Sequence, residues 1–130
     1  MAKKAEIQFR VRKVAITDID AEVTSIGDAL NMVLLHVFYG DETFGFFGNS
    51  DMPAYINLLM MTGCKTLKEL VGKKVNLLEH RRLRTDGIWT EWDYIAVGKS
   101  NKYTHFFGND ERIYTCREMC SLTKEMESSQ

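Results

Sequence analysis

The chain has 130 residues and a mass of 15.0 kDa, which is the length of one domain. Apolar residues make up 45% of it and charged residues 27%, a balance that excludes disordered and fibrous classes. The net charge is −1, so we expect no strong nonspecific attraction to nucleic acid or to a membrane.

The composition also indicates a compartment. We expect no membrane span, because the chain has no apolar run of about 18 residues. We expect no secretory leader, because Met-Ala-Lys-Lys at the start is not followed by an apolar region. The odd number of cysteines, three, fits a reducing cytoplasm better than a disulfide-linked secreted scaffold. We therefore predict a cytoplasmic protein.

The apolar pattern of the first part of the chain predicts strands. Residues 6–16 alternate, with an apolar phase change that predicts a β-bulge near Arg12–Lys13. Residues 17–28 are acidic and predict a loop, with a short strand around 19–23 as the alternative. Residues 30–39 are apolar on both faces, which predicts a central strand, and Gly40-Asp41-Glu42 turns the chain into a hairpin partner over 43–47.

Two short helices follow in the middle of the chain. We expect the first to be capped by Ser50 or Asp51, to end at Gly63 and to bury a stripe formed by its apolar residues, which are Tyr55, Ile56, Leu59 and Met60. The second begins with a capping box, Thr66 with Glu69, and ends at Gly72.

The pattern of the remaining residues predicts a meander of three strands and a C-terminal helix. We expect strands over 75–80, 88–97 and 102–107, separated by a polar loop at 81–87 and a turn at 98–101. Thr115 with Glu118 forms another capping box that opens a C-terminal helix. The fold class is therefore α+β, a mostly antiparallel sheet or small sandwich or barrel with two short central helices and a C-terminal helix. Residues 1–130 form one compact domain, in which 114–130 are the C-terminal helix and a frayed tail.

A repeated string gives one candidate ligand site. Phe46-Phe47-Gly48-Asn49-Ser50-Asp51 recurs as Phe106-Phe107-Gly108-Asn109-Asp110-Glu111. Common turn chemistry is one interpretation, because Phe suits strands and Gly-Asn supplies positive φ. The other is that Phe46 and Phe106 stack on a ligand while Asn49 and Asn109 bond a base edge or a ribose.

A basic loop beside tryptophans gives a second candidate. Arg81, Arg82 and Arg84 lie close to Trp89 and Trp92, and guanidinium groups beside aromatic rings hold phosphates and stack on bases. A second basic region comprises Lys3, Lys4, Arg10, Arg12 and Lys13. A merely solvated loop with core tryptophans is the competing interpretation.

Enzymatic and metal sites have little support in the sequence. His80, His105 and Asp93 are the acid–base candidates, but no diagnostic spacing joins them. Cys116 and Cys120 lie one helical turn apart, yet a second close pair of metal ligands is missing from the sequence. We predict no enzyme, no cofactor and no metal.

Five strings follow one another along the chain: Gly45-Phe46-Phe47-Gly48, Met60-Met61-Thr62-Gly63, Leu67-Lys68-Glu69-Leu70-Val71-Gly72-Lys73-Lys74-Val75, Ala96-Val97-Gly98 and Phe106-Phe107. In this succession they resemble a family of small, uncharacterised bacteriophage-encoded accessory proteins. The resemblance spans residues 5 to about 111 and departs from the family at Phe47, in the basic loop and after Thr115. It implies a phage origin, a location in the host cytoplasm and a nonenzymatic accessory role.

These observations predict a protein that acts by stoichiometric binding. We expect it to inhibit a host defence component, either by covering a host protein or by sequestering a nucleotide signal. The predicted ligand-binding residues are Phe46, Asn49, Arg81, Arg82, Arg84, Trp89, Phe106 and Asn109. A single-stranded nucleic-acid-binding module is the alternative. We also expect self-association as one means of covering exposed strand edges.

Overall fold

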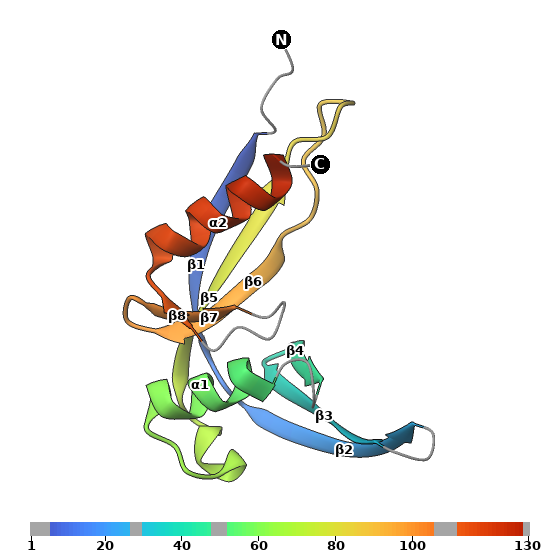
Figure 1. The fold of residues 1–130 in the computed structure, drawn as a ribbon, viewed down its shortest axis with the longest axis vertical. Coiled ribbons are helices and arrows are strands. Elements are labelled where there is room, and N and C mark those ends of the chain that lie inside the picture. Colours follow the sequence, from blue (N-terminus) through green and yellow to red (C-terminus); the bar gives the residue numbers. More distant parts are fainter. Residues whose placement is uncertain (1–5, 27–29, 48–51, 106–111, 129–130) are drawn as a thin grey trace.

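The computed structural model describes residues 6–26, 30–47, 52–105 and 112–128 (Figure 1). The larger sheet has the strand order β1-β5-β6-β7-β8, comprising β1 (Ile7–Ala15), β5 (Lys74–Arg82), β6 (Asp93–Lys99), β7 (Lys102–His105) and β8 (Ile113–Tyr114). The smaller has the order β2-β3-β4, comprising β2 (Asp18–Ile26), β3 (Leu30–Tyr39) and β4 (Glu42–Phe47). The helical elements are α1 (Met52–Thr62), a 3₁₀ turn η1 (Leu67–Leu70) and α2 (Cys116–Ser128).

Every strand pairing in the described part of the chain is antiparallel, so the predicted α+β class with a mostly antiparallel sheet and a C-terminal helix is confirmed. Within the described residues the two sheets are open and do not close into a barrel.

The long strands β1 and β5 serve two hydrophobic cores on opposite faces of the larger sheet. Figure 1 shows α2 lying across the upper part of the sheet, whereas α1 and the smaller sheet lie at its lower part. Phe9 and Leu78 belong to the core beneath α2, together with the fully buried Met119. Val14 and Leu77 belong to the other core, which the smaller sheet and α1 complete. Burial therefore changes face along each strand.

This arrangement corrects the predicted bulge near Arg12–Lys13. The β1–β5 register runs without a shift from Ile7 opposite Arg82 to Ala15 opposite Lys74. The apolar phase change arises because odd-numbered positions near Phe9 face α2, while Val14 faces the other core. The register shift lies instead in the β5–β6 pairing, between Leu78 and Glu79.

The acidic segment is a strand, so the predicted loop over 17–28 is wrong. β2 pairs along its length with β3, and the alternative short strand around 19–23 was closer but too short. Cross-strand pairing overrides the weak strand propensity of its acidic residues. β3 lies between β2 and β4, as its apolar pattern predicted. The hairpin turn is confirmed at Gly40 and Asp41, whereas Glu42 already pairs with Tyr39 as the first residue of β4.

The first helix buries a different face from the predicted one. Ala54 and Leu58 are the buried apolar residues of α1, whereas Ile56 and Met60 are exposed. Tyr55 and Leu59 are partly buried against the same core. Nearly every residue of this helix is apolar, so its sequence has no polar face that would fix its rotation. The proposed caps Ser50 and Asp51 lie outside the described residues.

Both predicted capping boxes mark the starts of helical elements. The Glu69 carboxylate accepts the Thr66 N–H at 3.3 Å, but the element is a 3₁₀ turn and not an α-helix. At α2 the box is reciprocal: Glu118 N–H donates to Thr115 Oγ1 at 3.2 Å, and Thr115 N–H donates to Glu118 Oε1 at 3.0 Å. These bonds satisfy N–H groups that a helix start leaves open.

The predicted strand over 88–97 begins later, at Asp93. Residues 83–92 form an ordered loop in which Leu83 and Trp89 make an isolated antiparallel bridge. β7 ends at His105, and the rest of the strand predicted to Phe107 lies outside the described residues. Within the part of the chain that the structure describes, neither helix has the length and apolarity needed to span a membrane.

Candidate functional site

The pairing of β1 with β5 gathers polar side chains on the sheet face away from α2. Gln8 lies opposite Arg81 and Arg10 lies opposite Glu79. Residues directly opposite one another in an antiparallel pair project to the same face. Phe9 and Leu78, next to them in sequence, project to the α2 face. The register therefore joins the two basic regions that the sequence keeps far apart.

Two arginines and two tryptophans form an alternating stack on this face. The Arg10 guanidinium carbon lies 4.3 Å from the centre of the Trp92 ring. The Arg81 guanidinium carbon lies 4.8 Å from the Trp92 ring and 4.9 Å from the Trp89 ring. We call Arg10, Trp92, Arg81 and Trp89 the Arg–Trp stack. Each cation–π contact of this kind contributes on the order of 0.5–1 kcal/mol at a partly exposed position.

Hydrogen bonds donated by the ε-nitrogens orient both arginines of the stack. Arg10 Nε donates to Glu79 Oε1 at 3.0 Å, and Arg81 Nε donates to Gln8 Oε1 at 2.7 Å. Within the described residues, the terminal Nη groups of Arg10 and Arg81 have no hydrogen-bond partner. Two oriented guanidinium ends thus remain available for an anion, which they can hold in a bidentate manner.

Arg12 extends the polar face toward the smaller sheet. Its Nε donates to Glu79 Oε1 at 2.6 Å, its Nη1 donates to Glu42 Oε2 at 3.1 Å, and its guanidinium lies 5.8 Å from the Tyr39 ring. Hydrogen bonds to Glu79 and then to Glu42 raise the pKa of Arg12 above its usual value. Burial, followed by the charge of Glu42, raises the pKa of Tyr39. All three guanidinium nitrogens of Arg12 therefore donate hydrogen bonds to carboxylates of this chain, whereas Arg10 and Arg81 donate only through Nε within the described residues.

Backbone contacts within the 83–92 loop position Trp89. Thr90 ties the loop to β5 twice, because its N–H donates to the Arg82 carbonyl at 2.8 Å and its Oγ1 accepts the Arg82 N–H at 2.9 Å. The turn between them is closed by Arg84 N–H donating to the Ile88 carbonyl at 2.9 Å. The stack is consequently held by a defined loop and by the sheet.

The three predicted arginines of the basic loop do not act together. Arg81 joins the stack, but Arg82 lies opposite Ile7 and, by strand alternation, on the other face of the sheet. Arg84 forms an exposed ion pair with Asp86 at 3.0 Å. Of the three arginines predicted to bind phosphates, Arg81 alone contacts the predicted ligand-binding residue Trp89 within the described residues.

The repeated string contributes little to the site. Phe46 is only 2% exposed, and its ring packs 5.7 Å from Phe44 and 6.1 Å from Tyr55, measured between centroids. This burial argues against the stacking role predicted for Phe46. Asn49, Phe106 and Asn109 lie outside the described residues.

Sequence reasoning placed Trp92 beside the basic loop and Arg10 in a separate basic region, and it missed the contact between them. The alternation of Gln8, Arg10 and Arg12 showed a polar strand face, but not which strand would pair with it. The pairing with β5 supplies the missing information.

The acid–base candidates lie elsewhere. His80 is opposite Asp93 in the β5–β6 register and stacks on Phe9, with ring centroids 6.5 Å apart. His105 is buried opposite Ala96. His80 and Asp93 are therefore neighbours, whereas His105 belongs to the interior of the sheet.

The thiol of Cys120 is held in its protonated form. Burial, and then the neighbouring Cys116, raises the pKa of Cys120 to about 11. We expect iodoacetamide to modify Cys120 roughly a hundredfold more slowly at pH 8 than in the unfolded chain, because the thiolate is the reactive species. The rate should rise with pH until about 11. Mass spectrometry of the modified peptide measures it, and equal rates in folded and urea-unfolded protein would contradict the assigned burial.

Among the described residues, no three His, Cys, Asp or Glu side chains are grouped so that they could hold a metal ion. A scan against protein-family models, a search of curated proteins and a search of solved structures each found no match to this chain. The Arg–Trp stack is thus the strongest candidate site on geometric grounds alone.

Proposed function

We propose that this protein acts by stoichiometric binding and without turnover, as a phage accessory protein in the host cytoplasm that inhibits a host defence component. Its resemblance to small phage accessory proteins supports the setting. The Arg–Trp stack supports the mode of action, because arginine and tryptophan are the side chains most often found where binding energy concentrates.

The observation that carries the proposal is the pair of oriented guanidinium ends in the stack. Arg10 and Arg81 are fixed through their ε-nitrogens, so an incoming anion meets side chains that have already lost much of their conformational freedom. A nucleotide signal suits this geometry better than a host protein surface does, because the two Nη groups of each guanidinium match the spacing of phosphate oxygens.

A nucleotide would use both parts of the stack. Its phosphates would accept hydrogen bonds from Arg10 and Arg81, and its base would lie against Trp89, which ends the stack within the described residues. Sequestration requires no reacting group, so this function does not depend on His80, His105 or Asp93. Occlusion of a host protein by the same face is the second form of the proposal.

Calorimetric titration with nucleoside triphosphates and cyclic dinucleotides tests the nucleotide form. We expect one compound to bind with simple stoichiometry, without chemical change, and to quench tryptophan fluorescence. Arg81→Met should weaken that binding at least about tenfold, because it removes a charged donor and half of the contacts to Trp92.

Arg84→Met is the matched control for this titration. Arg84 lies in the same loop, carries the same charge and is paired with Asp86 outside the stack, so its replacement should change the affinity less than about twofold. Equal losses in the two variants would show that the loop acts only through its net charge. Conversion of any compound into product would refute stoichiometric binding.

A single-stranded nucleic-acid-binding module is the alternative function, and the same stack of tryptophan and arginine favours it. Small barrels often bind single strands, and the two open sheets of the described residues give that alternative less support. A salt titration separates the two functions. Oligonucleotide affinity that falls steeply between low and moderate salt supports the alternative, whereas no binding at low salt removes it.

A further inference from the structure

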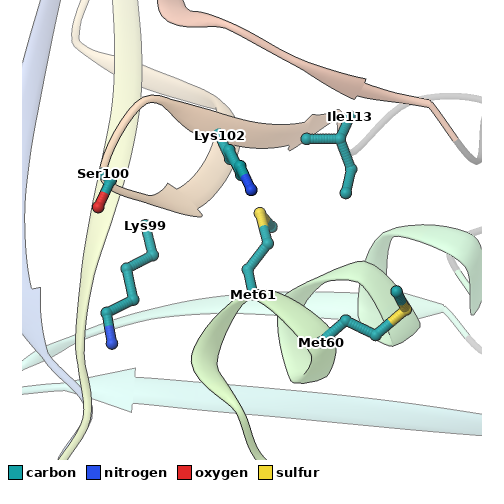
Figure 2. Close-up of a pocket in the computed structure, with 6 residues that line it drawn as sticks. All are labelled: Met60, Met61, Lys99, Ser100, Lys102 and Ile113. Atoms are coloured by element: carbon teal, nitrogen blue, oxygen red, sulfur yellow. The ribbon is translucent and has the colours of Figure 1, made fainter.

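A second binding feature lies where α1 meets the β6–β7 hairpin, on residues that the proposed function does not use. A hollow of about 410 Å³ opens there between Met60, Met61, Lys99, Ser100, Lys102 and Ile113 (Figure 2). Figure 2 shows the Lys102 and Met61 side chains extending toward one another across it. Met60 is 67% exposed and Ile113 is 37% exposed, so apolar side chains meet solvent beside two ammonium groups.

The hollow continues around the hairpin turn. A neighbouring hollow of about 230 Å³ shares Lys99 and Ser100 and is lined as well by Lys13, Lys74 and Asn76. We call the two hollows together the lysine groove. Lys13 lies opposite Asn76 on the α2 face of the sheet, whereas Lys99 and Lys102 pair with one another on the α1 face, so the groove follows the end of the hairpin from one face to the other. The residues that line the groove include none of the four side chains of the Arg–Trp stack, so the two are separate sites.

The turn that joins the hollows is firmly held. Ser100 occupies the first of two turn positions with φ 56°, and its carbonyl accepts a hydrogen bond from Asn76 Nδ2 at 3.1 Å. Asn101 Oδ1 accepts the Cys116 N–H at 3.0 Å, which fastens the turn to the start of α2. The lysines thus project from a fixed backbone.

Charge is unbalanced along this groove. The four lysines are exposed, and within the described residues none of their ammonium groups forms an ion pair with a carboxylate. They are Lys13, Lys74, Lys99 and Lys102. Since the whole chain has a net charge of −1, this cluster is a local excess of positive charge.

We propose that the lysine groove binds an acidic segment of a partner protein, with one apolar side chain of that segment seated between Met60 and Ile113. Carboxylates on either side of that anchor would pair with the groove lysines. Methionine suits such an anchor site, because its flexible thioether adapts to differently shaped apolar side chains.

The lining of the groove favours a protein segment over a nucleic acid. The described residues that line it include no aromatic ring on which a base would stack, and such stacking supplies much of the affinity for single strands. Flexible lysines, in contrast to planar guanidinium forks, suit carboxylates that are spread along an extended chain.

Fluorescence anisotropy with a dye-labelled peptide of aspartates and glutamates around a central leucine tests this inference. We expect binding at low salt that the double variant K99E/K102E weakens at least about tenfold. Replacing the central leucine by serine should also weaken it. Circular dichroism confirms the folded state, and K99Q/K102Q provides a milder version if charge reversal unfolds the protein.

The matched control is K65E/K68E, which makes the same change in net charge at exposed lysines outside the groove. It should alter the affinity less than about twofold. Equal losses in the groove and control variants would overturn the proposal, because they would indicate attraction to overall charge. A peptide that does not bind at low salt would also overturn it, as would an oligonucleotide that competes for the same lysines with higher affinity.

Self-association through the lysine groove would also overturn the proposal that an acidic segment of a partner protein occupies it. If sedimentation shows an oligomer that K99E/K102E dissociates, the occupant of the groove is a second copy of this chain. The nucleotide titration remains an independent measurement, because Arg81→Met leaves the groove intact and K99E/K102E leaves the Arg–Trp stack intact. Failure of one proposal is therefore distinguishable from failure of the other.

Discussion

Replacing Gly98 with alanine should destabilise the protein by about 3 kcal/mol or more, with a matching fall in the midpoint of urea unfolding. Gly98 lies in β6 between Asn76 of β5 and Tyr103 of β7. A Cβ atom built there overlaps the Lys102 carbonyl oxygen and approaches the Lys102 carbonyl carbon to 2.7 Å and the Tyr103 Cα to 2.9 Å. These are backbone atoms, so the overlap cannot be relieved by rotating a side chain.

Gly87→Ala is the control for this substitution. Gly87 has φ +85°, and a Cβ placed there meets no atom within 4 Å. Its replacement should cost about 1 kcal/mol, the ordinary strain of a positive φ in an L-residue. If Gly98→Ala costs no more than Gly87→Ala, the β6–β7 hairpin is less tightly paired than described. The lysine groove, which depends on that hairpin, would then lose its support as well.

Local chemistry identified most of the secondary structure from the sequence. The capping boxes at Thr66 and Thr115 and the turn at Gly40 marked element boundaries, because each depends on residues only a few positions apart. The acidic strand β2 was misread because its stability comes from pairing with β3 and not from its own propensity.

Errors about burial arose from tertiary arrangement. The apolar phase change in β1 predicts a bulge only for a strand that packs against one core, whereas β1 contributes side chains to two cores on opposite faces. In α1, the exposed Ile56 and Met60 cannot be distinguished by hydrophobicity from the buried Leu58. Only the position of the sheets relative to the helix decides which apolar face is covered.

The sequence located only part of the candidate site, because the remaining contacts also depend on tertiary arrangement. Arg81 and Trp89 are eight positions apart and could be associated through a loop, whereas Arg10 reaches Trp92 only because β1 pairs with β5. Phe46 belonged to a repeated string that suggested function, yet its ring is a core side chain. Membership of a repeated string therefore did not mark Phe46 as a ligand contact.

Glu79→Gln should lower the free energy of unfolding by about 2 kcal/mol and disturb the Arg–Trp stack. The Glu79 side chain is only 5% exposed, and it accepts hydrogen bonds from both Arg10 and Arg12. Glutamine keeps the shape but loses the charge, and its amide N–H₂ would face a guanidinium donor. Arg10 would then be less firmly held over Trp92, so nucleotide affinity and tryptophan fluorescence should change together with stability.

Glu42→Gln is the control for Glu79→Gln, because it removes the same charge at an exposed position instead of a buried one. Glu42 contacts the same Arg12 guanidinium, but its side chain is 56% exposed. Its replacement should therefore change stability by no more than about 0.5 kcal/mol and should leave the stack unaffected. Added salt should weaken the Glu42 pair more than the enclosed Glu79 pairs. If the two substitutions cost the same, Glu79 is not the buried carboxylate that orients Arg10, and the anion site proposed for Arg10 and Arg81 loses its pre-organised half.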